Sequence, residues 1–161
     1  MSELATTINS LLGDTLDRME RRVKIARVQE AIESHANALG EDPFPLEHIF
    51  VPGVYARTII APQGALVVTK IHKTEHLIFM LKGDVSVLSE EGVIRLTAPC
   101  MFISLAGAKR VVYIHEETHW VNVHANPDDE TDIGIIEQRV IASDYSEFPL
   151  ETSSEDKKCL G

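Results

Sequence analysis

The stretch that decides the fold is residues 75–87, which read EHLIFMLKGDVSV. Two short apolar runs, 76–81 and 84–88, flank Lys82-Gly83-Asp84, whose composition is typical of a turn. We therefore expect two strands joined in a hairpin at Gly83. Because side chains alternate along a strand, His76, Ile78 and Met80 share one face, which we expect to point into the fold.

Similar runs continue on both sides of this hairpin, from Val51 to about Ile141. They are separated by turn-forming residues such as Pro62-Gln63-Gly64 and Glu90-Glu91-Gly92. Many short strands at this spacing predict a mainly β protein with a single barrel or jelly roll. The other predicted strands are residues 55–60, 65–71, 93–97, 101–104, 109–115, 118–124 and 133–141.

The N-terminal part has a different periodicity, because apolar residues recur at helical spacing and residues 2–39 contain no proline. Gly13 interrupts the pattern, and Asp14 is a suitable N-cap for a second helix. The predicted organisation is a helical arm over 1–40, a barrel over 41–142 and a polar tail over 143–161. Two offset stripes are visible in the arm, the first Leu4, Ile8, Leu12, Leu16, Met19, Val23 and Ala26, the second Ile25, Val28, Ile32, Ala36 and Leu39.

The composition is that of a globular protein, with 44% hydrophobic and 25% charged residues in a chain of 161. The net charge of -10 argues against a surface that follows nucleic acid phosphates. We find neither a run of 18 apolar residues nor the pattern of a signal peptide, so we expect no membrane insertion and a cytoplasmic location.

The segment around Gly83 resembles the first motif of the cupin superfamily, the RmlC-like jelly rolls. That motif contains a glycine, a pair of histidines, a glutamate and a closing glycine. Downstream, Pro99 and Gly107 lie where the second cupin motif is expected. The resemblance covers about residues 51–125 and implies a cupin barrel. The residues that correspond to the first motif are Gly64, His72, Glu75, His76 and Gly83.

The chain departs from the cupin pattern at the positions of the metal ligands. If Gly83 is the closing glycine of the motif, the position of the glutamate is occupied by His76. The position of the second histidine is then occupied by His72, and that of the first histidine by Lys70. In the second motif Arg110 takes the place of the histidine. Cations at two ligand positions suit a metal site only if they bind an anionic ligand.

A metal site can still be assembled from three histidines. His124 shares a strand face with Trp120 and Asn122, and it would join His72 and His76. Three imidazoles with an open position suit zinc, iron or nickel. In the alternative interpretation, these histidines form hydrogen bonds in a polar barrel mouth or lie at strand ends by chance.

We also expect a site for a small anionic ligand. Its predicted residues include two cations, and the alternative is that these cations pair with nearby glutamates. The predicted ligand-binding residues are Lys70, Arg110, Tyr113 and Trp120.

The arm gathers cations at Arg18, Arg21, Arg22, Lys24 and Arg27, while residues 128–156 contain ten acids and one base. We expect the arm to dock on the tail or on another subunit. Acids interleave with the arm's cations and there is no recognition motif, so we do not expect nucleic acid to be the partner.

Three functions remain open. Residues 70–76, Arg110 and 117–124 are also similar to small cupin-like proteins of tailed bacteriophages. The first hypothesis is therefore a non-catalytic binding or structural protein that assembles through its arm, as a homo-oligomer or with another assembly protein, in a phage particle or its assembly machinery. It would then be located in the virion or the host cytoplasm. The second is a metal-dependent cupin enzyme that acts on a small anionic molecule. The third is a ligand-sensing regulator whose arm contacts DNA.

Overall fold

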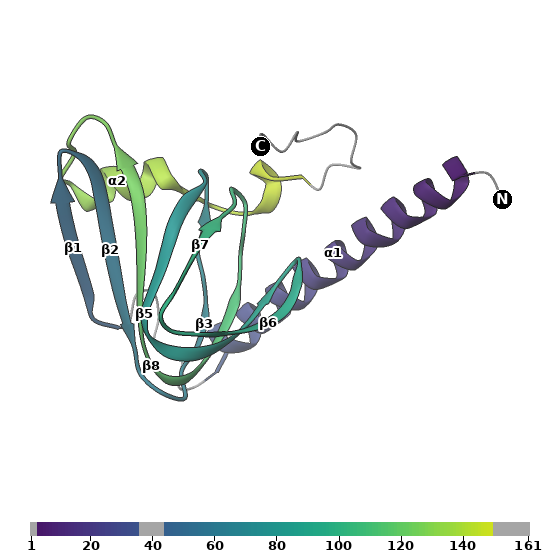
Figure 1. The fold of residues 1–161 in the computed structure, drawn as a ribbon, viewed down its shortest axis with the longest axis horizontal. Helices are drawn as coiled ribbons and strands as arrows, with labels where there is room; N and C mark the ends of the chain where they lie inside the picture. The colour runs from purple at the N-terminus through teal and green to yellow at the C-terminus, as the bar shows by residue number, and fades with distance from the viewer. Residues whose placement is uncertain (1–2, 36–43, 150–161) are drawn as a thin grey trace.

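The structure is a computed structural model that describes residues 3–35 and 44–149. Helix α1 (Glu3–Glu33) projects from a body made mostly of strands (Figure 1). The prediction of a mainly β protein with an N-terminal helical arm is confirmed. The strands are β1 (Leu46–Val51), β2 (Gly53–Ala61), β3 (Leu66–Val68), β4 (Ile71–His72), β5 (His76–Ser89), β6 (Gly92–Thr97), β7 (Cys100–Ser104), β8 (Val111–Asn126) and β9 (Ile141–Ala142).

Seven strands form one antiparallel sheet in the order β1-β2-β8-β5-β6, with β3 paired to β8 and β7 paired to β5. The long strands β5 and β8 pair along most of their length, and the sheet curls around a shared core (Figure 1). Among the described residues the two ends of this path, β1 and β6, do not pair. The predicted barrel is therefore a jelly roll with an open sheet rather than a closed barrel.

Gly83 does not close a hairpin, because it lies inside β5 where the register with β8 shifts between Met80 and Val85. Its φ of 110° is in the region that favours glycine. A Cβ atom there would lie 2.2 Å from the Oγ1 atom of Thr118. Gly83 thus allows a bulge and a close approach of β8, and the hairpin turns later, between Ser89 and Gly92.

The strands predicted at 109–115 and 118–124 form one continuous strand, β8, and β1 begins before the first predicted strand. The predicted strand at 133–141 is wrong. These residues form helix α2 (Ile133–Val140), which leads into the two-residue strand β9. The side chain of Asp132 caps the helix by accepting a hydrogen bond from Ile135 N, and Ile136 and Val140, four residues apart, are buried.

Helix α1 continues through Gly13 and Asp14, so the predicted break is wrong. A glycine inside a helix costs only about 1 kcal/mol relative to alanine, which does not interrupt a helix of this length. The second half of α1 packs on β3 and β5 through Ile25, which is fully buried. The described start of the predicted tail contains the short 3-10 helix η1 (Tyr145–Glu147), and residues 150–161 lie outside the described part.

The main core lies between the two layers of the jelly roll. Ile78 and Met80 of β5 belong to it, as the strand alternation predicts. A second cluster joins Tyr55 of β2 to Ile136 and Val140 of α2, so α2 is packed against the end of the sheet. None of the described helices has the length and hydrophobicity needed to span a membrane. The main core contains Ala61, Ile78, Met80, Val85, Val87, Val112, Ile114 and Trp120.

Candidate metal centre and anion site

Three histidines from different strands meet at the end of the sheet that α2 covers. His72 comes from β4, His76 begins β5 and His124 lies near the end of β8. One ring nitrogen of each lies within 4.8 Å of the others. The pairing of β5 with β8 holds His76 and His124 together, and their ring centroids are 4.4 Å apart.

Hydrogen bonds orient these rings. The Nδ1 atom of His76 lies 3.1 Å from the carbonyl oxygen of Thr74, which can only accept, so Nδ1 carries the proton. The Nε2 atom of His76 then accepts from His72 Nδ1 at 2.8 Å. The Oδ1 atom of Asn122 lies 3.3 Å from the same Nε2 atom and, being an acceptor, does not bond to it in this tautomer. The Nδ1 atom of His124 is buried without a hydrogen-bond partner among the described residues.

The histidines are neutral at pH 7. Burial, followed by the charges of the neighbouring His76, His124, Arg110 and Arg57, lowers the pKa of His72 to about 2. Burial, followed by His76 and Arg57, lowers the pKa of His124 to about 4. The pKa of His76 is also lowered, mainly by burial. Neutral imidazoles have a free lone pair, which is the form that binds metal ions.

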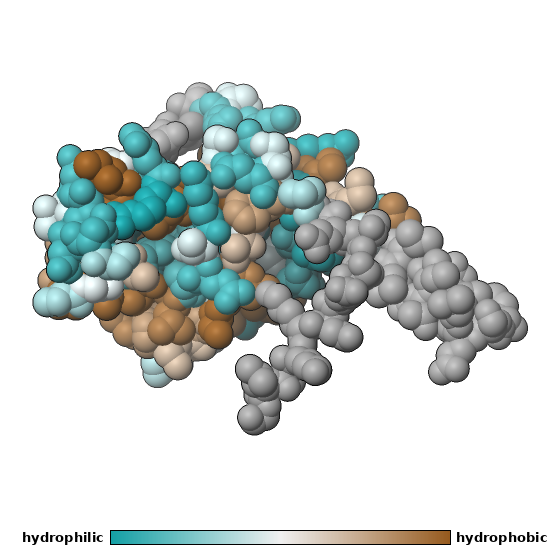
Figure 2. All heavy atoms as spheres, turned by 90° about the horizontal axis from the view of Figure 1, so that it is seen from above, coloured by the Kyte–Doolittle hydropathy of each residue, from teal (hydrophilic) through white to brown (hydrophobic). Residues whose placement is uncertain are grey.

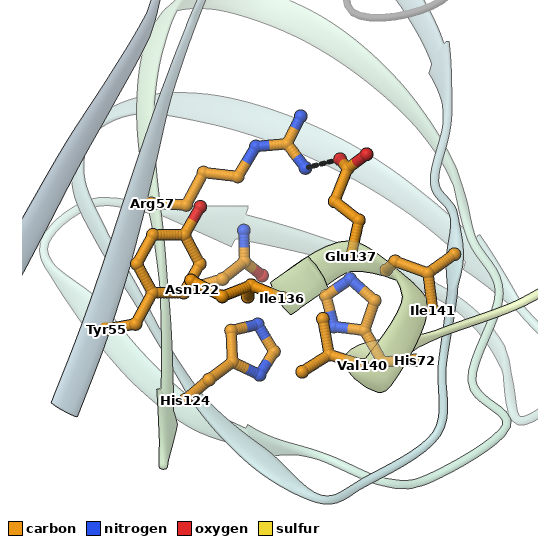
Figure 3. A pocket seen from close by; sticks show the side chains of 9 residues that line it. All are labelled: Tyr55, Arg57, His72, Asn122, His124, Ile136, Glu137, Val140 and Ile141. Atoms are coloured by element: carbon orange, nitrogen blue, oxygen red, sulfur yellow. Dashed lines mark hydrogen bonds and ion pairs between the residues drawn. The ribbon is translucent and has the colours of Figure 1, made fainter. Parts of the chain in front are cut away.

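A small cavity lies beside the histidines, between the sheet and α2 (Figure 3). Its free volume is about 20 Å³, enough for a water molecule or an ion. The ring of Tyr55 stacks on that of His124, with centroids 6.2 Å apart. Glu137 is the one carboxylate among the lining residues, which are Tyr55, Arg57, His72, Asn122, His124, Ile136, Glu137, Val140 and Ile141.

Positive charge surrounds this cavity. Arg57 Nη1 and Lys70 Nζ lie 3.4 Å and 3.2 Å from the same oxygen, Oε1 of Glu137. Arg110 donates to the hydroxyl of Ser104 at 3.0 Å, and burial lowers its pKa. Ser104 is the strand partner of His76, so Arg110 also lies close to the histidines.

The structure brings together most of the predicted site residues. His72, His76 and His124 form one cluster, and Lys70 and Arg110 lie beside it. The other two predicted ligand-binding residues, Trp120 and Tyr113, lie elsewhere. Trp120 is buried in the main core against Phe102, and Tyr113 is exposed on β8, where its ring contacts His115. The structure therefore does not bring Trp120 and Tyr113 to the cavity.

Sequence reasoning missed three residues of the site. Tyr55 and Arg57 are two apart on β2, and this alternation alone could have placed them on one inward face. Arg57 pairs in register with Asn122 of β8, which sequence periodicity does not reveal. Glu137 was missed because residues 133–141 were taken for a strand.

Comparisons with known proteins give structural matches only, because no family model and no curated protein match the sequence. A cupin-2 domain protein from Shewanella frigidimarina is 12% identical over 51% of this chain and 80% of that chain, with a TM-score of 0.43. An RmlC-like cupin family protein from Methanocaldococcus jannaschii is 13% identical over 53% and 84% of the two chains, with a TM-score of 0.42. A mutant of Bacillus subtilis oxalate decarboxylase is 13% identical over 60% and 27%, with a TM-score of 0.46. In fold, this chain is similar to cupin-domain proteins, as the motif around Gly83 predicts.

Proposed function

We propose that this protein binds a divalent transition metal through His72, His76 and His124, and that the metal acts on a small anionic molecule. The observation that carries the proposal is that one partly buried and two buried imidazoles present ring nitrogens within 4.8 Å of one another. A metal ion at this position would supply a Lewis acid with open coordination positions.

The donor set suits such an ion. Nitrogen ligands of a tetrahedral zinc lie roughly 3.4 Å apart, since zinc–nitrogen bonds are about 2.0–2.1 Å long, so small side-chain rotations would suffice. The carbonyl of Thr74 holds the Nδ1 proton of His76, an arrangement common behind histidine ligands. Metal binding would replace the proton between His72 and His76 and would give the buried Nδ1 of His124 a partner.

The charges around the site favour an anionic substrate. Arg57, Lys70 and Arg110 surround the histidines, and a divalent ion would add two further positive charges. Glu137 is the only negative side chain among the residues that line the cavity. A small anion bound beside the metal would lower this electrostatic cost.

The proposal is tested by titrating chelator-treated protein with Co²⁺ and recording its visible absorption. Wild-type protein should bind one ion per chain, and His124→Ala should lose that binding. His115→Ala is the matched control, because His115 lies outside the cluster and bonds to Ser86. Equal binding by wild type and His124→Ala would contradict the proposed site.

A second candidate function is assembly through the arm, because the two apolar stripes of α1 have different surroundings. Ile25 of the second stripe is fully buried. The first stripe is exposed at Leu16, Met19 and Val23, with exposed fractions of 60%, 51% and 49%. Hydrophobic residues are visible on the described part of the arm in Figure 2. This exposed stripe supports association through the arm. We propose such association as the basis of a non-catalytic role, for example in a bacteriophage particle.

Assembly is tested by light scattering of the full chain. We expect a stable oligomer for the wild type and a lower mass for Met19→Glu, which places a charge in the exposed stripe. Ala31→Glu is the control, because Ala31 is also exposed but lies two turns beyond Val23, outside the exposed apolar stripe. A monomeric wild type, or an unchanged mass in Met19→Glu, would contradict assembly through this stripe.

A further inference from the structure

The side chain of Glu137 occupies a position between two cations of the candidate site. Its Oε1 atom lies 3.4 Å from Arg57 Nη1 and 3.2 Å from Lys70 Nζ. The contact with Arg57 is the dashed line in Figure 3. The two cations come from the sheet and its loops, whereas Glu137 comes from α2. A carboxylate that belongs to a separate element is thus held by a pair of cations from the body of the protein.

Arg57 is the firmly placed part of this arrangement. Arg57 is a central residue of β2, paired in register with Asn122 of β8 and with His48 of β1, and only 11% of its side chain is exposed. Burying a guanidinium is costly unless a negative partner compensates its charge. A carboxylate or a chemically similar anion in front of Arg57 therefore stabilises its charge.

Glu137 is the most exposed of the three charged side chains. Its side chain is 35% exposed, more than that of Arg57 or Lys70. Helix α2 is anchored by the burial of Ile136 and Val140, not by Glu137. Glu137 can therefore rotate toward solvent while α2 stays packed on the sheet.

We propose that Arg57 and Lys70 form a binding site for a small carboxylate, and that Glu137 fills this site until the ligand replaces it. The inference deepens the proposed function by naming the class of the anionic ligand and the residue that competes with it. Asn122 is adjacent to Arg57 across the strand pair and also contacts His76, so a carboxylate held there would lie beside the histidine cluster.

The test is calorimetric titration of metal-free full-length protein with malonate, and separately with inorganic phosphate. Glu137→Gln removes the internal carboxylate and keeps the size of the side chain. We expect this variant to bind malonate at least about tenfold more tightly than wild type, because the carboxylate of residue 137 no longer competes with the ligand. Adding Lys70→Gln to Glu137→Gln should remove this gain.

Glu147→Gln is the matched control, because Glu147 also pairs with a lysine, Lys73, but lies outside the cavity. It changes the net charge by the same amount and should leave malonate binding at the wild-type level. Equal affinity of wild type and Glu137→Gln, or a gain of the same size in Glu147→Gln, would overturn the inference. Tighter binding of phosphate than of malonate by Glu137→Gln would overturn the carboxylate class.

The outcome does not depend on the metal, since the titrations use metal-free protein. A gain in malonate affinity together with absent cobalt binding would reject the metal site and keep the carboxylate site. Cobalt binding without a gain in malonate affinity would reject the carboxylate site and keep the metal site.

Discussion

The Nδ1 atom of His72 lies 2.8 Å from the Nε2 atom of His76, although the two residues belong to different strands of different sheets. Strand β4, which carries His72, pairs only with β9 within the described part of the chain, and β9 follows α2 directly. The C-terminal segment therefore helps to position a histidine of the candidate metal centre. The same segment, which contains α2 and β9, also supplies Glu137. It therefore contributes to both the metal centre and the anion site.

Stability should fall as the pH is lowered below about 6.5, because the folded histidines resist protonation. The pKa of His72 is about 2 and that of His124 about 4, whereas both would be near 6.5 in the unfolded chain. Below pH 6.5 the unfolded state therefore binds more protons than the folded state, and the free energy of unfolding decreases. The expected loss is about 2 kcal/mol per histidine at pH 5 relative to pH 7.5.

This pH dependence is measured by urea unfolding in the presence of chelator, so that metal binding does not contribute. His124→Asn should show a smaller loss between pH 7.5 and pH 5 than the wild type. A free energy of unfolding that is constant over this range would contradict the burial of neutral histidines.

Gly83→Ala should destabilise the fold by at least about 2 kcal/mol, because both the backbone and the packing oppose a side chain. The φ angle is 110°, and a Cβ atom would lie 2.2 Å from Thr118 Oγ1 and 2.8 Å from its Cα. Gly92→Ala is a useful comparison, since its φ is also positive at 129° but no atom lies within 4 Å of the added Cβ. Equal losses for the two variants in urea unfolding would show that the contact with β8 is unimportant.

Glu90→Ala should release the docked half of the arm. The carboxylate of Glu90 is 9% exposed and accepts hydrogen bonds from Arg22, at 2.9 Å for its Nε atom. Removing it leaves the arginine without this compensation, which typically costs a few kcal/mol for a buried pair. Limited trypsin digestion should then cleave the arm faster than in the wild type.

Glu91→Ala is the control for this experiment. Glu91 also pairs with the arm, through Arg18 at 3.6 Å, but its side chain is 68% exposed and the pair should contribute little. Arm cleavage that is equally fast in both variants, or unchanged in Glu90→Ala, would contradict the assignment of Glu90 as the anchor.

Local periodicity was enough to predict most of the strands and the inward face of β5, and it identified the three histidines. It could not distinguish a turn from a bulge at Gly83, because both need a residue that tolerates positive φ. It also mistook residues 133–141 for a strand, since Ile133 and Ile135 alternate as in a strand, whereas Ile133, Ile136 and Val140 follow helical spacing. The N-cap at Asp132 was the local signal for a helix.

The anion site was harder to predict because its members are far apart in the sequence. Lys70 and Arg110 were expected beside the histidines on the basis of motif positions. Arg57 and Glu137, separated by 80 residues, meet only because α2 folds back over the end of the sheet. Such a contact depends on tertiary packing, which the spacing of residues along one chain does not encode.

The most direct test of the central claim is elemental analysis of the full-length protein, purified without chelator. The account predicts close to one equivalent of zinc, iron or nickel per chain in the wild type and in His115→Ala, and its loss in His124→Ala. Metal-free wild-type protein whose thermal unfolding is unchanged by added Zn²⁺ would contradict it.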